Sequence, residues 1–193
     1  MTLIEAIATF FGLICVWLTV KQNIWCWPTG IAQVTLYIFV FYDARLYSDM
    51  ILHIIYVIIN VYGWYHWLYG NKEKEELKVS LVGKWIWMWL IICVVGTFAW
   101  GYIMANYTNA ALPYYDSFIT AASLIAQWLM ARKIVESWWF WIVVDIVAVG
   151  VYFVKGLYIT TGLYAVFLVM ATMGYFEWRR AYRKEKTMAV AVY

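Results

Sequence analysis

The chain carries an internal repeat at a fixed spacing of 111 residues. Residues near 5–67 align without a gap with residues near 116–178. The matched positions include Leu13, Trp17, Trp27, Leu52, Gly63 and Trp67, which recur as Leu124, Trp128, Trp138, Leu163, Gly174 and Trp178. Such a repeat predicts that one structural unit occurs twice, so the two copies must fold in nearly the same way.

The composition indicates where the repeated unit lies. Of the 193 residues, 66% are hydrophobic and only 13% are charged. A soluble domain of this length cannot hide so much apolar surface from water, whereas lipid does not require it to be hidden. Duplicated membrane units are typical of transporters, whose binding site forms between the two copies.

Seven segments are long and apolar enough to be read as membrane helices, which need roughly 20 residues. They lie near 3–20, 25–42, 47–69, 85–105, 116–132, 138–154 and 157–178. Three fall in each copy and one lies between the copies, so the linker helix gives both copies the same orientation. The sequence therefore predicts an all-α polytopic membrane protein with 3+1+3 parallel repeats, an arrangement known from the SWEET class.

This arrangement divides the chain into four parts. We expect a first three-helix bundle at 1–70, a loop and linker helix at 71–110, a second bundle at 111–180 and a tail at 181–193. The Lys/Glu run at 72–78 is expected to be a solvated loop, and the polar tail is expected to begin at Arg179.

The basic residues indicate the orientation in the membrane. With seven spans, all 14 Lys and Arg residues except Arg45 and Lys155 fall on one side. Because basic loops stay in the cytoplasm, we predict a cytoplasmic C-terminus and an external N-terminus.

Polar and aromatic side chains recur at helical spacing in four of these segments. They are Gly30, Gln33 and Tyr37; Asp49, His53, Tyr56 and Asn60; Thr120, Ser123 and Gln127; and Trp138, Trp141, Asp145 and Tyr152. Polar groups are costly in lipid, so these stripes are expected to face a common interior that forms a substrate path. Asn60 and Gln127 could instead be hydrogen-bond partners between helices, and His53 could be a packing residue.

Asp145 is the polar residue that most needs a partner. It lies half-way along its segment, and no basic residue lies within a turn of it. A buried carboxylate either binds a proton or pairs with a positive group. The partner could be a cationic ligand, a coupling proton or hydrogen-bond donors from other helices. Trp138 and Trp141 share its face, and an aromatic pair beside a carboxylate suits a flat, positively charged ring.

Several motifs carry a resemblance to a known family. They are Trp-Pro-Thr-Gly at 27–30, Leu-Tyr-Ser-Asp-Met at 46–50, Asn-Val-Tyr-Gly-Trp-Tyr-His-Trp at 60–67, Glu-Ser-Trp-Trp-Phe-Trp at 136–141, Lys-Gly-Leu-Tyr at 155–158 and Gly-Tyr-Phe-Glu-Trp at 174–178. With these motifs, in this order, the chain resembles the PnuC family of bacterial vitamin transporters. The resemblance implies a SWEET-type fold, a homotrimer and uptake of nicotinamide riboside; related members carry thiamine or riboflavin.

The resemblance also implies roles for individual residues. Trp138 and Trp141 match the family's Trp-x-x-Trp motif and would enclose the pyridine ring, so both rings are expected to face a cavity. Polar positions on the second and third helices correspond to Gln33, His53 and Asn60. The Asn that precedes the first Trp of the family motif is replaced by Ser137, which leaves the vitamin less defined than the fold.

These observations lead to one functional hypothesis. We predict uptake of nicotinamide riboside by facilitated diffusion, with the two bundles rocking around a central site; thiamine or riboflavin transport and a passive channel are the alternatives. Because nicotinamide riboside and thiamine both carry a positive ring, Asp145 suits either. The predicted substrate-binding residues are Gln33, Tyr37, Asp49, His53, Asn60, Gln127, Trp138, Trp141 and Asp145.

The sequence lacks the motifs that other functional classes of membrane protein require. The chain has no G-x-x-x-x-G-K-[ST] motif for ATP, and its last apolar segment has no Lys for a retinal Schiff base. His53 and His66 form no metal-binding pattern, and the three cysteines are scattered. We therefore expect no enzyme activity, cofactor, metal or nucleic-acid partner.

Overall fold

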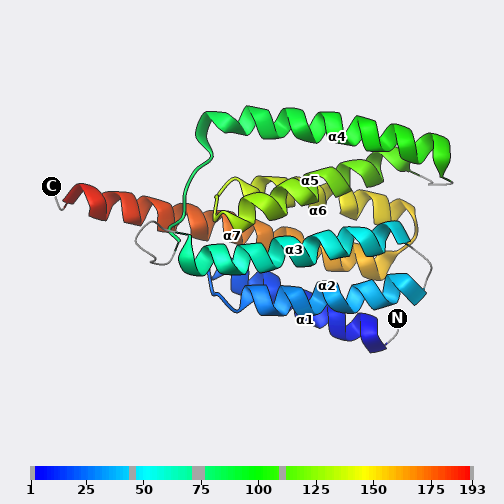
Figure 1. Ribbon diagram of the computed structural model, residues 1–193, viewed down its shortest axis with the longest axis horizontal. Helices are drawn as coiled ribbons and strands as arrows, with labels where there is room; N and C mark the ends of the chain where they lie inside the picture. Colours follow the sequence, from blue (N-terminus) through cyan, green and yellow to red (C-terminus); the bar gives the residue numbers. More distant parts are fainter. Residues whose placement is uncertain (1–2, 44–46, 71–76, 109–111, 192–193) are drawn as a thin grey trace.

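The computed structural model describes residues 3–43, 47–70, 77–108 and 112–191. It contains the seven predicted helices, which run side by side along one axis (Figure 1). They are α1 (Leu3–Val20), α2 (Cys26–Asp43), α3 (Tyr47–Tyr69), α4 (Ile86–Tyr107), α5 (Pro113–Ala131), α6 (Ser137–Val154) and α7 (Tyr158–Ala191), with a short 3-10 turn, η1 (Gly83–Trp85), before α4.

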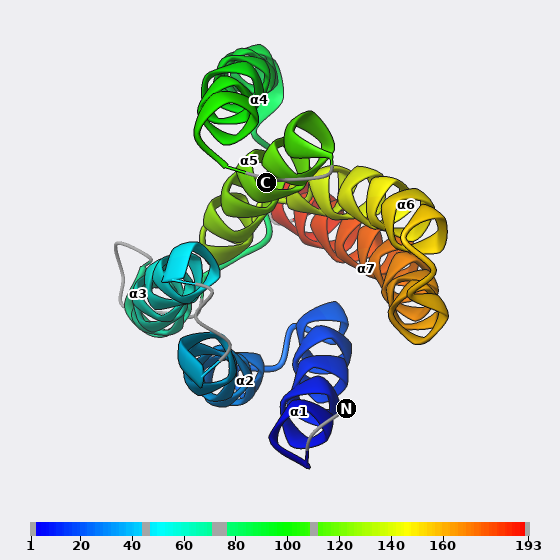
Figure 2. The same cartoon turned by 90° about the vertical axis from the view of Figure 1, so that its right-hand side faces the viewer.

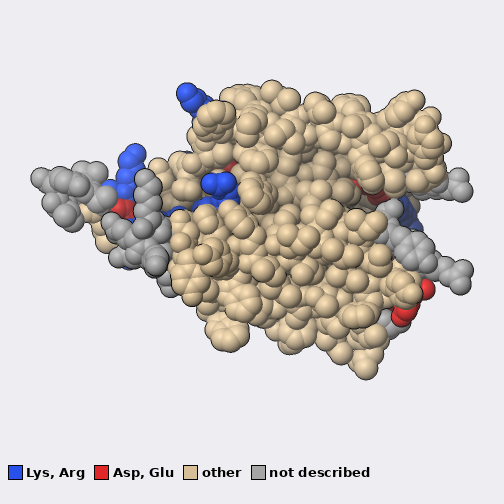
Figure 3. Space-filling view, viewed as in Figure 1, with Lys and Arg blue, Asp and Glu red and all other residues tan. Residues whose placement is uncertain are grey.

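The surface of the bundle fits a lipid environment. Five helices, α1, α3, α4, α6 and α7, are long and apolar enough to cross a membrane. The other two, α2 and α5, fall below that apolarity and lie parallel to them (Figure 1). Lys and Arg gather at one end of the molecule, and the middle of the visible face is almost free of charge (Figure 3). The predicted all-α polytopic membrane fold is therefore confirmed.

The two copies of the repeat have the same helix order and direction. Helices α1–α3 make up the first copy and α5–α7 the second, and these two groups are called the first and the second bundle. Helix α4 joins the copies in sequence and runs in the direction opposite to α3, so α1 and α5 point the same way (Figure 1). Below, the end of the molecule where α1, α3 and α5 finish is called the basic end. The other end, where the chain begins, is called the opposite end.

Six helices form a closed ring. Each helix packs on its neighbours in the order α1, α2, α3, α5, α6, α7 and back to α1, while α4 lies outside the ring and packs on α5 (Figure 2). The bundles therefore meet at two interfaces, α3–α5 and α1–α7. The repeat relates α1 to α5 and α3 to α7, so these two interfaces are equivalent.

The repeat extends to the ends of helices α1 and α5. Gln22 and Lys133 both adopt a left-handed backbone with φ of 55°. Gln22 N–H donates to the Thr19 carbonyl, and Lys133 N–H donates to the Met130 carbonyl, each at 2.9 Å. These are Schellman turns, in which glycine is the usual residue at the left-handed position. Their recurrence 111 residues apart shows that the two copies share local geometry as well as helix order.

Four tryptophans form the core at the basic end. Trp27 packs edge-on against Trp67 at 5.2 Å between ring centroids, and Trp138 packs edge-on against Trp178 at 5.5 Å. The Trp67 and Trp178 rings also touch, at 5.7 Å, and so join the two bundles. A glycine in α3 and another in α7 let the Trp27 and Trp138 rings lie directly on the helix backbone.

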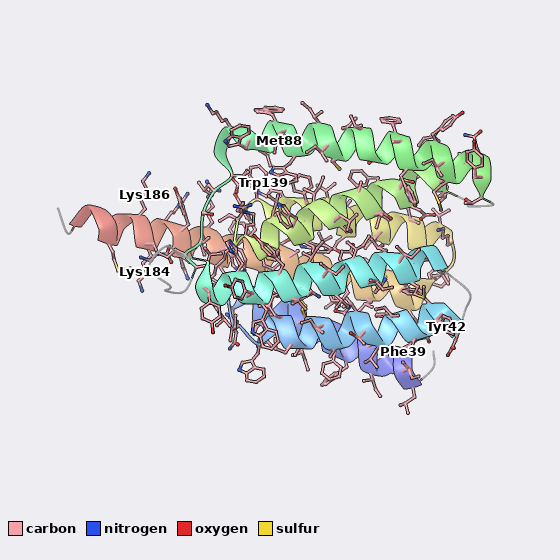
Figure 4. All side chains as sticks on the ribbon, in the orientation of Figure 1. Phe39, Tyr42, Met88, Trp139, Lys184 and Lys186 are labelled. Carbon is pink, nitrogen blue, oxygen red and sulfur yellow. The ribbon has the colours of Figure 1, made fainter. Side chains whose placement is uncertain are left out.

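Helix α7 is longer than predicted. Its apolar pattern was expected to end near 178, but the helix continues through the basic residues to Ala191. This part contains neither Gly nor Pro and is rich in Arg, Lys, Glu and Ala, which favour helices. Lys184 and Lys186 project from the part that extends beyond the bundle (Figure 4). The predicted end of the last helix was therefore wrong.

A short extended segment, Leu77–Val82, crosses the basic end and is called the strap. Ser80 pairs with Ile134 in an isolated β-bridge, and Val79 is only 4% exposed. Most of the run expected to be a solvated loop, residues 72–76, lies outside the described residues. Of the remainder, Lys78 is exposed and Leu77 is half-buried, so the chain folds onto the protein soon after the run.

Candidate functional site

The predicted polar stripes of α2 and α3 meet in the half nearer the opposite end. The His53 ring lies 5.6 Å from Tyr37, 4.8 Å from Phe41 and 5.7 Å from Tyr56. Its Nδ1 lies 2.9 Å from the Asp49 carbonyl oxygen one turn earlier. The structure thus brings two predicted residues, Tyr37 and His53, into one partly buried aromatic cluster, while Asp49 is exposed and contacts His53 only through its backbone carbonyl.

The second bundle places aromatic groups at matching positions. Tyr152 and Tyr164 lie 5.1 Å apart, measured between their ring centroids. The repeat relates them to Phe41 and His53. Tyr164 was not predicted from the sequence, although the spacing of 111 residues from His53 was a signal that could have identified it.

Asp145 lies in α6 with only 3% of its surface exposed. In the described part of the chain, no hydrogen bond or ion pair reaches its carboxyl group. The expected burial of this acidic side chain in a candidate membrane span is confirmed.

Asn60 and Gln127 bind each other across the α3–α5 interface. The Gln127 Nε2 donates to the Asn60 Oδ1 at 2.6 Å, and Asn60 is buried. This is the interhelical pairing considered as the alternative to substrate binding. A role for Asn60 and Gln127 in binding substrate stays a prediction.

Gln33 packs against α1. A Cβ placed on Gly12 would come within 2.7 Å of the Gln33 amide nitrogen, so the absence of a side chain at Gly12 makes room for this amide. Gln33 is half-buried. It is therefore separate from the direct contacts that link His53, Tyr37 and Phe41.

The two predicted tryptophans differ in their surroundings. Trp138 is 2% exposed and is enclosed by Trp178 and Gly174. We expected its ring to face a cavity, but in this conformation it does not. Trp141 is half-buried and packs against the tryptophan core and against a second buried cluster, which includes Leu129 and Val144. The indole Nε1 of Trp138 is buried with no acceptor among the described residues, and so is that of Trp27, its counterpart in the first copy.

Two hollows lie away from these residues. One, of about 320 Å³, lies at the basic end and is lined by Gln22, Asn23, Ile24, Trp25, Trp67, Leu68 and Lys133. The other, of about 310 Å³, is an apolar groove on α4 lined by Trp87, Leu90, Ile91, Val94 and Val95. Neither includes a predicted substrate-binding residue.

The site carries groups for binding rather than for reaction. Its members are tyrosines, a histidine, amides and one buried carboxyl group. Among the described residues, no group of three His, Cys, Asp or Glu side chains could hold a metal ion. Such a set of side chains suits a flat polar ligand that stacks on aromatic rings and interacts with a carboxylate.

Comparison with known proteins identifies the family. Residues 2–180 match the family model described as nicotinamide mononucleotide transporter. The chain is 27% identical to the nicotinamide riboside transporter PnuC of Escherichia coli, over 97% of this chain and 90% of the relative. It is 28% identical to that of Neisseria mucosa, over 94% of this chain and 73% of the relative.

A further relative and a solved structure extend the comparison. The riboflavin/roseoflavin transporter RibM of Streptomyces davaonensis is 25% identical, over 90% of this chain and 83% of the relative. The crystal structure of the vitamin B3 transporter PnuC matches with a TM-score of 0.74 and 25% identity, covering 94% of this chain and 82% of that one. The chain thus belongs to the nicotinamide mononucleotide transporter family, whose members are membrane transporters and not enzymes.

Proposed function

We propose that this protein carries nicotinamide riboside across the bacterial inner membrane by facilitated diffusion. Two relatives bear the name nicotinamide riboside transporter and match most of this chain. The single structural observation that supports the substrate is the buried carboxyl group of Asp145, which has no hydrogen-bond or ion-pair partner among the described residues. Nicotinamide riboside contains a flat pyridinium ring, and its positive charge would pair with this carboxylate.

The physical argument is one of compensation. An ionised carboxylate without a partner is costly inside a membrane protein, and a bound cation removes much of that cost. Trp141, one helical turn before Asp145 in α6, would add stacking and cation–π attraction for a positively charged ring. We propose Gln33, Tyr37, Asp49, His53, Asn60, Gln127, Trp138, Trp141 and Asp145 as substrate-binding residues, with Tyr152 and Tyr164 as additions from the structure.

A second candidate substrate comes from the relative RibM, named a riboflavin/roseoflavin transporter. Riboflavin has a larger ring system and no fixed positive charge, so it gains nothing from the charge of Asp145. Thiamine, by contrast, carries a positive ring and would satisfy Asp145 as nicotinamide riboside does. The charge argument therefore ranks both cations above riboflavin.

Counterflow in proteoliposomes tests the proposed substrate. Vesicles are loaded with unlabelled nicotinamide riboside, thiamine or riboflavin, and uptake of the same radiolabelled compound is followed. We expect saturable counterflow of nicotinamide riboside and much less counterflow of riboflavin. Exchange of riboflavin alone would contradict the proposal, and uptake proportional to concentration without saturation would indicate a channel.

We further propose that the basic end lies in the cytoplasm and that the protein is a homotrimer. The orientation follows from the excess of Lys and Arg at that end. For assembly, α4 provides a candidate surface, because it packs on α5 alone within the ring and leaves Trp87, Ile91 and Val95 exposed. Native mass spectrometry from detergent should give the mass of three chains, and a monomer mass would contradict the trimer.

A further inference from the structure

The two interfaces between the bundles are equivalent in sequence but differ in construction. Each contains the same bond at the basic end. The Trp67 Nε1 donates to the Met130 carbonyl oxygen at 3.2 Å in the α3–α5 interface. The Trp178 Nε1 donates to the Thr19 carbonyl oxygen at 3.0 Å in the α1–α7 interface. Because the repeat relates these bonds, any difference between the interfaces comes from what surrounds them.

The α3–α5 interface has further links from its middle to the basic end. Gln127 donates to Asn60 at 2.6 Å. The Tyr62 and Trp128 rings stack at 5.1 Å between centroids with an interplanar angle of 10°. This interface is thus held at several depths along the helices, and separating it requires all of these contacts to break together.

The strap adds backbone links to this interface and not to the other. Leu77 N–H donates to the Trp67 carbonyl at the end of α3. Ser80 exchanges two backbone hydrogen bonds with the α5–α6 turn, donating to Lys133 and accepting from Val135, at 3.1 and 3.0 Å. Val82 N–H donates to the Glu136 carboxylate at 3.0 Å. The strap therefore ties the end of the first bundle to the second.

The α1–α7 interface is held near the basic end only. Besides the Trp178 bond, it has one ion pair, between Lys21 and Glu177 at 3.7 Å, and these side chains are 47% and 43% exposed. Exposed pairs of this kind contribute little. Nearer the opposite end, no hydrogen bond, ring contact or ion pair joins α1 to α7 among the described residues, and the two helices spread apart (Figure 2).

We propose that the α3–α5 interface is a hinge and the α1–α7 interface is the gate that opens the basic end. Among the described residues, opening at α1–α7 breaks one buried hydrogen bond, one exposed ion pair and the contact between the Trp67 and Trp178 rings. Opening at α3–α5 would break the strap, the amide pair and the ring stack as well. The proposal rests on the proposed transport function, since a transporter must expose its site at this end. It replaces symmetric rocking of the bundles with a one-sided swing.

Spin-label distances test this asymmetry without any substrate. One label pair, Asn23→Cys with Arg180→Cys, spans the gate, and a second, Tyr69→Cys with Arg132→Cys, spans the hinge; all four residues are exposed at the basic end. The background replaces Cys15, Cys26 and Cys93 with Ala. The purified protein is measured by double electron–electron resonance.

Trp178→Phe and Trp67→Phe are matched variants, since each keeps an aromatic ring and removes one of the two related hydrogen bonds. We expect Trp178→Phe to raise the population with a long gate distance about fivefold, the effect of one hydrogen bond of ordinary net strength. Trp67→Phe should change the population with a long gate distance less than twofold, because the strap and the amide pair remain. The hinge distance should stay short in both variants.

Three outcomes would overturn the hinge and gate. They are equal lengthening of both pairs, an equal response of the gate to the two variants, and no response to Trp178→Phe. If that variant does not fold, the unmodified protein still tests the proposal, because the gate pair must then show a broader distance distribution than the hinge pair. Because no vitamin is added, these distances test the hinge and the gate separately from the proposed substrate.

Discussion

Asp145 is the buried acidic residue that we expect to recognise the positive charge of the ligand. Its carboxyl group is buried in α6, and no described residue pairs with it. Asp145→Asn keeps the shape and removes the charge. We expect this variant to weaken binding of nicotinamide riboside by about 2 kcal/mol, the scale of an interaction with a charged group. Binding of the neutral, reduced-ring analogue should change much less, and titration calorimetry measures both.

The same variant separates the other roles of Asp145. If the carboxyl group carries a coupling proton, counterflow survives in Asp145→Asn while accumulation driven by a pH gradient is lost. Unchanged affinity for the cation together with unchanged pH-driven accumulation would contradict both functional roles. Asp145 would then be a protonated residue that stabilises helix packing.

Trp138 and Trp141 are expected to respond differently to truncation. Because the Trp138 ring is enclosed at 2% exposure, Trp138→Ala should lower the free energy of unfolding by about 3–5 kcal/mol. Trp141 is half-buried, so Trp141→Ala should mainly weaken substrate binding, by about 1–3 kcal/mol, through lost stacking and cation–π attraction. Thermal unfolding in detergent and a binding titration separate the two effects. A Trp138→Ala protein with an unchanged Tm would show that the ring is not part of the core.

At the scale of helices, the close contact between α6 and α7 depends on a bare backbone at Gly174. A Cβ there would lie 2.5 Å from the Trp138 ring, whereas nothing lies within 4 Å of a Cβ at Gly162 on the same helix. We therefore expect Gly174→Ala to destabilise the protein by about 1–3 kcal/mol through overpacking. The control Gly162→Ala should be neutral or stabilise α7 by up to about 1 kcal/mol. Equal melting temperatures for the two variants would contradict this packing.

Helices and their direction could be predicted because they depend on local properties of the chain. An apolar stretch of membrane length is visible without knowing its neighbours, and the repeat added the grouping into two bundles. The end of α7 was missed because apolarity marks the membrane boundary and not the end of the helix. The turns at Gln22 and Lys133 gave no signal, since neither residue is the glycine that such a turn favours.

The surroundings of single side chains were harder to predict, because they depend on helices far apart in the chain. Trp138 was assigned to a cavity from its neighbours in α6, but its position is decided by Gly174 in α7. The joint recurrence of Trp27 with Gly63 and of Trp138 with Gly174 was the available signal for this packing. The strap had no comparable signal, since it pairs through a single bridge with a turn.

For the whole molecule, the charge distribution predicts how the protein is inserted. Lys186 projects beyond the basic end, and Tyr107 is 79% exposed at the opposite end of α4. In a background without Cys15, Cys26 and Cys93, a membrane-impermeant maleimide added to intact cells should label Tyr107→Cys and not Lys186→Cys. Labelling of Lys186→Cys alone would reverse the orientation.

Facilitated diffusion of a cation must respond to membrane potential, and this response is the most direct test of the central claim. An elementary charge gains about 2.3 kcal/mol per 100 mV, so about 60 mV corresponds to a tenfold concentration ratio. Proteoliposomes holding a potential of about −60 mV inside should therefore accumulate radiolabelled nicotinamide riboside about tenfold, with no pH gradient present. Equal concentrations inside and outside at that potential, or accumulation that follows only an imposed pH gradient, would contradict facilitated diffusion of the cation.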